Sequence, residues 1–226
     1  MDLALKETFL YMDVLLLTPE AKKELSSLKN DNKETNASAF DLQMESNAGC
    51  TANVALIYKN TLYVANAGDS RCLLVSKKEI VSMSLDHKPD SEPEKQRIVK
   101  AGGFVIDGRM NSNLNLSRAI GDLEYKKNPN IGVDEQLIIA VPDIKTYTLN
   151  GKTDFILLGC DGVWETMSNL DIVECIYDHL KKGTELKFVV EELLDKLVAN
   201  DTFSNLIIKK LSDLNHFYKK RRCWMR

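Results

Sequence analysis

The 226-residue sequence has few of the features that mark secreted, membrane-spanning or nucleic-acid-binding chains. Its five cysteines are scattered and odd in number, and no two form a Cys-x-x-Cys pair, which fits a reduced compartment. No apolar run is long enough to cross a bilayer, and the amino terminus shows no cleavable signal. The formal net charge of −3 provides no basic field for nucleic acid. We therefore expect an intracellular protein, in the cytoplasm or the nucleus, with neither DNA nor a membrane as its partner.

The composition is that of a folded chain, with 44% hydrophobic and 28% charged residues. Apolar residues at the spacing of one helix face predict a helix over residues 2–17. They are Leu5, Phe9, Met12 and Leu16. Thr18 as N-cap and Pro19 in the first turn predict a second helix, whose apolar face comprises Ala21, Leu25 and Leu28. Residues 29–47 lose this periodicity and fill with polar side chains, which predicts a mobile loop.

The middle of the chain changes to short apolar segments of period two, which predict strands. These are residues 51–59, 61–68, 71–76, 79–84, 136–144 and 154–160. The link Lys59-Asn60 is a candidate hairpin turn, and short connections favour antiparallel pairing. Strands in a block with helices before and after them indicate an α+β layered fold.

Three further helices are predicted from their capping residues. Ser91 and Glu94 have the spacing of a capping box, and Gly102 would end that helix. Ser168 with Asp171 begins the next helix, which runs to Gly183. The last helix opens at Thr184, and its apolar residues lie four apart, at Val189, Leu193 and Leu197.

Several aspartates follow strands or lie in turns, where carboxylates are well placed for hard cations such as Mg²⁺ or Mn²⁺. They are Asp69, Asp86, Asp107, Asp122, Asp143 and Asp161. Asp161 directly follows an apolar strand and precedes Gly162, which allows close backbone approach. The spacing alone fits a metal ligand or an ordinary Asp-Gly turn, and His87 beside Asp86 fits an acid-base group or a structural histidine. Both choices stay open at this point.

Five motifs carry a resemblance that goes further. They are residues 49–75 (GCTANVALIYKNTLYVANAGDSRCLLV), 85–105 (LDHKPDSEPEKQRIVKAGGFV), 108–126 (GRMNSNLNLSRAIGDLEYK), 141–144 (VPDI) and 160–169 (CDGVWETMSN). In this order and spacing they resemble the motifs of the metal-dependent protein serine/threonine phosphatases of type 2C, the PPM family. The resemblance implies an α-β-β-α sandwich of two antiparallel sheets flanked by helices. It also implies a two-metal centre whose activated water hydrolyses phosphoserine or phosphothreonine in a phosphoprotein.

The resemblance assigns roles to individual residues of this chain. Asp161 would ligate one metal of the pair, and Asp86 and Asp161 together would hold a weaker third metal. Glu165 stands where the family often has Asp or Glu, three residues after Gly162 in the same motif. Further residues are expected to support the scaffold near the site: Gly162, Asp69, Arg71, Arg118 and Asp122.

Other family motifs are not found in this sequence. The Asp-Gly-His-Gly-Gly motif is absent, as are the histidine that acts as general acid, the arginine that binds phosphate, and the later Gly-x-Asp-Asn segment. We therefore expect a partial phosphatase domain over residues 1–202, incomplete at both ends, with little or no activity by itself. A divergent tail with a basic end would follow over residues 203–226. A catalytically inactive pseudophosphatase that binds phosphoproteins is the alternative, and the oligomeric state is not predicted.

Overall fold

The computed structural model describes residues 1–30, 48–149 and 151–197. The chain divides into two compact units, Met1–Asp161 and Gly162–Arg226, and each is described by itself. Residues 31–47 of the predicted loop and the whole of the predicted tail, 203–226, lie outside the described residues.

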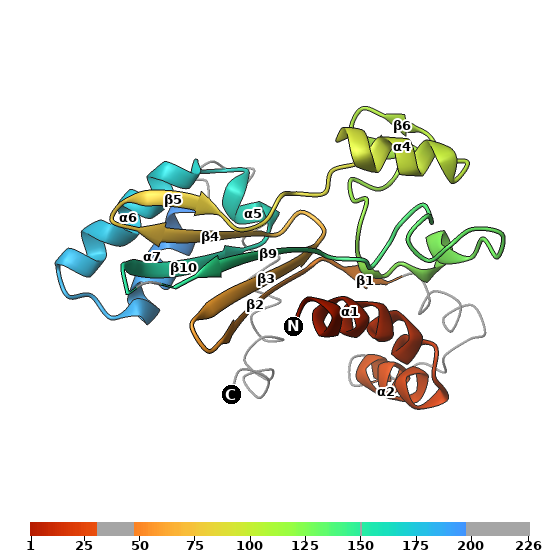
Figure 1. The fold of residues 1–226 in the computed structure, drawn as a ribbon, viewed down its shortest axis with the longest axis horizontal. Helices are drawn as coiled ribbons and strands as arrows, with labels where there is room; N and C mark the ends of the chain where they lie inside the picture. The colour runs from red at the N-terminus through yellow and green to blue at the C-terminus, as the bar shows by residue number, and fades with distance from the viewer. Residues whose placement is uncertain (31–47, 150, 198–226) are drawn as a thin grey trace. The chain divides into compact units, whose positions relative to one another are not determined.

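Two three-stranded antiparallel sheets form the centre of the first unit (Figure 1). One sheet has the order β2-β3-β9, with bounds Ala52–Tyr58, Thr61–Ala67 and Asp143–Thr148. The other has the order β10-β4-β5, with bounds Thr153–Gly159, Arg71–Ser76 and Glu79–Ser82. Two short pairs accompany them: β1 (Gly49–Cys50) with β8 (Ile120–Gly121), and β6 (Val105–Ile106) with β7 (Arg109–Met110). The predicted α+β class with two antiparallel sheets is confirmed.

The alternation of residues along β3 explains the layers. Leu62 and Val64 face the other sheet, where they pack with Leu74 of β4 in a core of fully buried side chains. Ala65 and Ala67 face the opposite way and contact Leu5 and Phe9 of helix α1 (Asp2–Leu16). Because successive side chains of a strand point to opposite faces, one strand buries both of its faces between a helix and a second sheet.

The amino-terminal helices follow their predicted signals. Leu5 and Phe9 are the buried residues of α1, as their spacing predicts. Helix α2 (Pro19–Asn30) packs beside α1, and the Thr18 hydroxyl accepts a hydrogen bond from the amide of Ala21 at 3.2 Å. Thr18 therefore serves as the N-cap of α2.

The turn between β2 and β3 is the predicted two-residue hairpin. Tyr58 pairs with Thr61, so that Lys59 and Asn60 form the turn, and Lys59 has a φ of 54°. The predicted strand over residues 136–144 is wrong for most of its length, because β9 begins only at Asp143.

The residues before β9 are buried but are not paired as a strand. Ile138 packs with Ile98 and Met110 in a third apolar cluster, and the Arg97 guanidinium donates to the carbonyl of Gln136 at 3.1 Å. Within the described part of the chain, this segment makes a single isolated bridge, between Ile139 and Arg118. The apolar pattern therefore reflects burial beneath helix α4, rather than a sheet ladder.

Helix α4 (Glu92–Lys100) begins where predicted and ends before Gly102, which has a φ of 91°. The predicted capping box is wrong, since Ser91 makes no side-chain cap. The Glu94 carboxylate turns instead toward two arginines, to which it is bound more strongly than it would be to a backbone amide. Figure 1 shows α4 and β6 beyond the ends of the two sheets. A short 3-10 helix, η2 (Leu123–Lys126), follows β8.

The second unit begins within a short helix, α5 (Asp161–Trp164), and continues with α6 (Asn169–Lys181) and α7 (Leu186–Leu197). The Ser168 hydroxyl accepts from the Asp171 amide at 3.2 Å, which confirms this predicted cap. α6 and α7 contact each other, and Val189 and Leu193 are buried. Among the residues that the structure describes, no helix is both long and apolar enough to span a membrane.

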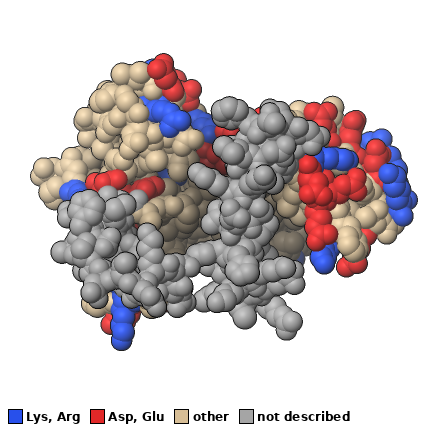
Figure 2. Space-filling model, turned by 180° about the vertical axis from the view of Figure 1, so that it is seen from behind, with Lys and Arg blue, Asp and Glu red and all other residues tan. Residues whose placement is uncertain are grey.

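Acidic and basic side chains lie next to one another on the face seen in Figure 2.

Candidate functional site

Asp86 and Asp161 lie at the same end of the β10-β4-β5 sheet. Asp86 follows β5, and its carboxylate is bound by Arg71, the first residue of β4. Gly159, the last residue of β10, is the register partner of Arg71, and Asp161 comes two residues later. The antiparallel register therefore places two aspartates that are 75 positions apart in sequence at the same end of this sheet.

The Arg71 guanidinium contacts both oxygens of Asp86. Its Nε donates to Oδ1 at 3.1 Å, and its Nη2 donates to Oδ2 at 2.8 Å. The side chains are 25% and 21% exposed. Two parallel N–H···O bonds of this kind fix the orientation of the carboxylate as well as its position. The hydrogen bond to Asp86 also raises the pKa of Arg71, despite the opposing effect of burial.

The other residues assigned to the metal site lie in different surroundings. Asp161 is partly exposed and opens α5, so it is not part of an Asp-Gly hairpin. Gly162 is exposed within α5, and Glu165 is exposed directly after it, in the second unit. The metal-site roles of Asp161 and Glu165 and the scaffold role of Gly162 remain predictions.

Metal binding can be tested against the donors that are present. Among the described residues, no group of three or more His, Cys, Asp or Glu side chains could hold a metal ion. Two close divalent cations repel each other and need several anionic oxygens to offset that repulsion. Since both oxygens of Asp86 are also bound by Arg71, the described residues by themselves do not fit a two-metal centre.

Two of the expected scaffold aspartates are buried. Asp69 follows the turn after β3 and forms an ion pair with Lys88. Asp122 has left-handed backbone angles, and its carboxylate lies so close over Gly49 that a Cβ there would be 2.3 Å from Oδ2. Burial raises the pKa of the Asp122 carboxyl, although the charge of Lys126 acts in the opposite direction. Asp69 is thus paired with a lysine of the protein, and Asp122 is packed against the backbone at Gly49.

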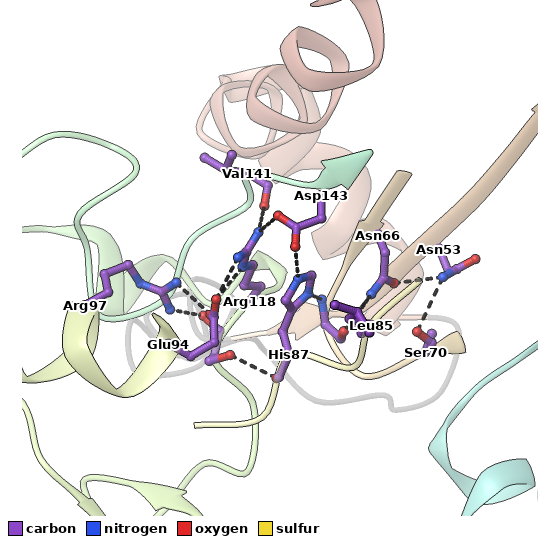
Figure 3. Close-up of polar contacts among 12 residues, drawn as sticks. Asn53, Asn66, Ser70, Leu85, His87, Glu94, Arg97, Arg118, Val141 and Asp143 are labelled. Atoms are coloured by element: carbon purple, nitrogen blue, oxygen red, sulfur yellow. Dashed lines mark hydrogen bonds and ion pairs between the residues drawn. The ribbon is translucent and has the colours of Figure 1, made fainter. Parts of the chain in front are cut away.

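His87 is a structural histidine in this geometry. It is 4% exposed, and its Nδ1 accepts a hydrogen bond from the Gly68 amide at 3.1 Å. Nε2 must then carry the proton, and it donates to Oδ2 of Asp143 at 3.1 Å (Figure 3). The His87 amide also donates to the Gly68 carbonyl at 3.0 Å. With both ring nitrogens engaged, His87 ties the turn after β3 to the segment that carries Asp86.

Asn66 strengthens the same connection. Its side-chain amide donates to the carbonyl of Leu85 at 2.8 Å and to that of Gly68 at 3.0 Å, while its oxygen accepts from Asn53 at 2.8 Å (Figure 3). Asn66 is 1% exposed, so these bonds satisfy polar groups that water does not reach.

An ion network, buried except at Asp143, whose side chain is 56% exposed, continues from His87 (Figure 3). Arg118 donates from Nη1 to Oδ1 of Asp143 at 2.8 Å, and from Nε and Nη2 to Oε1 of Glu94 at 3.0 and 2.7 Å. Arg97 donates from Nη1 to Oε2 of Glu94 at 2.7 Å. Each carboxylate oxygen of Glu94 is thus bound by an arginine, and the charges alternate along the network.

The network moves the pKa values of its two acids in the same direction. The hydrogen bond from His87, together with Arg118, holds the pKa of Asp143 far below its usual range despite partial burial. Burial by itself would raise the pKa of Glu94, but the bonds and charges of Arg118 and Arg97 outweigh it and lower that pKa. Both acids are therefore ionised at neutral pH.

The sequence did not reveal this network. Glu94 carried a capping-box signal, and Arg97 was not singled out, although the two are three residues apart on one helix. Asp143 was recognised only as one of several aspartates near strands. Its partners Arg118 and His87 come from segments 25 and 56 residues away, a pairing that no local pattern encodes.

Residues 4–206 match the family model for Protein phosphatase 2C. The chain is 52% identical over 221 residues to "Probable protein phosphatase 2C 2" of Paramecium tetraurelia, a match that covers 96% of this chain and 70% of that protein. It is 55% identical over 203 residues to "Protein phosphatase 2C 1" of the same organism, with 88% and 64% covered. The chain therefore spans about two thirds of the length of these relatives.

Solved structures give a consistent result. A phosphatase from Toxoplasma gondii superposes with a TM-score of 0.57 at 34% identity, covering 61% of this chain and 43% of that one. The serine-threonine phosphatase 2C of the same organism superposes with a TM-score of 0.56 at 22% identity, covering 78% and 58%. At the latter identity the likeness concerns the fold alone.

Proposed function

Because the chain belongs to the protein phosphatase 2C family, we propose that the protein hydrolyses phosphoserine and phosphothreonine in other proteins, with Mg²⁺ or Mn²⁺ as its cofactor. One observation supports this proposal within the chain itself. The register of β10 on β4 brings Asp161 to the sheet end where Asp86 is held. Carboxylates gathered at strand ends are the usual ligands of hard cations.

The family's reaction depends on cations that lower the pKa of water and neutralise the transferring phosphoryl group. The part of the chain described here offers two carboxylates at one place, and one of them is shared with Arg71. That is too little to hold a pair of cations firmly. We therefore expect the 226-residue chain to release phosphate slowly by itself.

The test is phosphate release from a phosphothreonine peptide by the purified chain, over long incubations with and without Mn²⁺. Asp161→Asn should reduce the rate to background, since the change removes one charge without altering the size of the side chain. Asp107→Asn is the matched control, because Asp107 is exposed and its φ of 50° suits asparagine. It should leave the rate unchanged. Absence of any metal-dependent release, or equal rates for both variants, would contradict the proposal.

A calorimetric titration with the same phosphopeptide, run beside the phosphate-release assay, separates the alternative. A chain that binds the phosphopeptide without metal, and never hydrolyses it, would be a phosphoprotein-binding module instead.

An intracellular location remains our proposal, based on cysteine usage. In the described part of the chain, Cys50, Cys72, Cys160 and Cys175 are all free thiols.

A further inference from the structure

Arg71, which the family resemblance implies as a scaffold residue, is paired directly with Asp86. Asp86 is one of the two carboxylates on which the proposed function relies, yet a guanidinium contacts both of its oxygens, at 3.1 and 2.8 Å. A carboxylate that accepts two bonds from a planar guanidinium gives one in-plane lone pair of each oxygen to the arginine. A divalent cation held by both oxygens would need those same lone pairs, and one held by a single oxygen would lie close to the guanidinium charge.

The pair is built into the fold rather than lying loosely on the surface. Arg71 is the first residue of β4 and is fixed by its register with Gly159 of β10. The backbone beside Asp86 is clamped by two bonds between His87 and Gly68, at 3.0 and 3.1 Å. Both side chains are partly buried, at 25% and 21% exposure, so that solvent screens their attraction only in part.

We propose that Arg71 is an internal competitor for divalent cations at Asp86, which keeps this carboxylate closed to Mg²⁺ or Mn²⁺ until the guanidinium moves away. Two physical effects act in the same direction. The guanidinium occupies the oxygens, and its positive charge repels a cation only a few ångströms away. Even after solvent screening, one such charge lowers cation affinity by at least about tenfold.

This inference deepens the proposed function, because it concerns one of the carboxylates of that site. The experiment reads cation binding rather than turnover. A chain without phosphatase activity can therefore still confirm the role of Arg71, and an active chain can still refute it.

The experiment is a titration of the isotope-labelled chain with MnCl₂, followed by paramagnetic broadening of the backbone amide signals of Gly68 and His87. These amides flank the pair, and their unchanged positions in the metal-free spectrum show that a variant has kept the clamp. In Arg71→Met the signals should broaden at Mn²⁺ concentrations at least about tenfold lower than in the wild type. Arg71→Met combined with Asp86→Asn should lose this gain.

Two further variants make the result decisive. Arg109→Met removes an equal charge from an exposed arginine whose Nη1 donates to the Asn113 carbonyl, and it should leave the titration as in the wild type. Arg71→Lys keeps the positive charge but frees one carboxylate oxygen of Asp86, so it should give a smaller increase in Mn²⁺ sensitivity than Arg71→Met. This variant tests the proposal if Arg71→Met does not fold. Equal Mn²⁺ sensitivity of the wild type and both Arg71 variants, or a gain that survives Asp86→Asn, would overturn the proposal.

Discussion

Replacing Glu94 by glutamine should remove the centre of the buried ion network at almost constant side-chain volume. The Glu94 carboxylate is 2% exposed and accepts three hydrogen bonds, two from Arg118 and one from Arg97. Glutamine keeps one acceptor oxygen but turns an N–H group toward a guanidinium that is also a donor. Two arginine side chains then share a buried site without their common counter-charge.

The expected loss of stability follows from this geometry. Removing one partner of a buried, hydrogen-bonded ion pair costs about 3–5 kcal/mol. For a chain of this size, each kcal/mol lowers the melting temperature by about 2–4 °C. The melting temperature of Glu94→Gln should therefore fall by about 6–20 °C. A loss of this size is a large share of a domain's total stability, which is about 5–15 kcal/mol.

Thermal unfolding followed by circular dichroism at pH 7 measures this change. Glu135→Gln is the matched control, because the Glu135 side chain is 41% exposed and pairs with the exposed Lys100 on the surface. Such pairs contribute little to stability in water, so the melting temperature of Glu135→Gln should stay that of the wild type. If Glu94→Gln and Glu135→Gln shift the melting temperature equally, the buried network does not stabilise the fold as described here.

Two further predictions concern backbone geometry and acid. Gly121→Ala should lower the free energy of unfolding in urea by about 2–5 kcal/mol, and Gly102→Ala by only about 1–2 kcal/mol. Both glycines have positive φ, but only a Cβ at Gly121 would meet a backbone atom, the Ala48 carbonyl oxygen at 2.4 Å. Equal losses of stability in the two variants would contradict this steric explanation. The folded-state pKa of Asp143 is depressed, so its contribution to stability is present above its ordinary pKa of 3.8 and is lost as the pH falls below that value. Asp143→Asn should therefore lower the urea midpoint at pH 7. The urea midpoint of this variant should also fall less steeply than that of the wild type as the pH is lowered toward 3, at about the pH where carboxylates titrate. An equally steep fall in both proteins would count against the role of Asp143.

Local signals in the sequence predicted most of the secondary structure. The spacing of Leu5 and Phe9, the caps at Thr18 and Ser168, and the stop at Gly102 all depend on residues within a turn or two of each other. The two failures have one cause. The strand expected over residues 136–144 and the capping box at Glu94 are local patterns overridden by partners far away in the chain.

In the candidate site, too, the sequence predicted individual residues but not the contacts between distant ones. A resemblance carried by ordered motifs pointed to Asp86 and Asp161, and family membership agrees with that resemblance. The bond from Arg71 to Asp86 was not foreseen, since the two residues are 15 positions apart and belong to different strand ends. The same holds for the contacts of His87, which only the packing of the turn after β3 could reveal.

The sequence by itself determined the class of fold, the positions of the helices and most strands, and the family. It could do so because hydrophobic periodicity, capping residues and motif order are properties of neighbouring residues. Only the tertiary structure decided which charges meet: Glu94 with two arginines, and Asp86 with Arg71. Electrostatic pairing depends on distance in space, and strand register and layer packing set that distance after the local elements have formed.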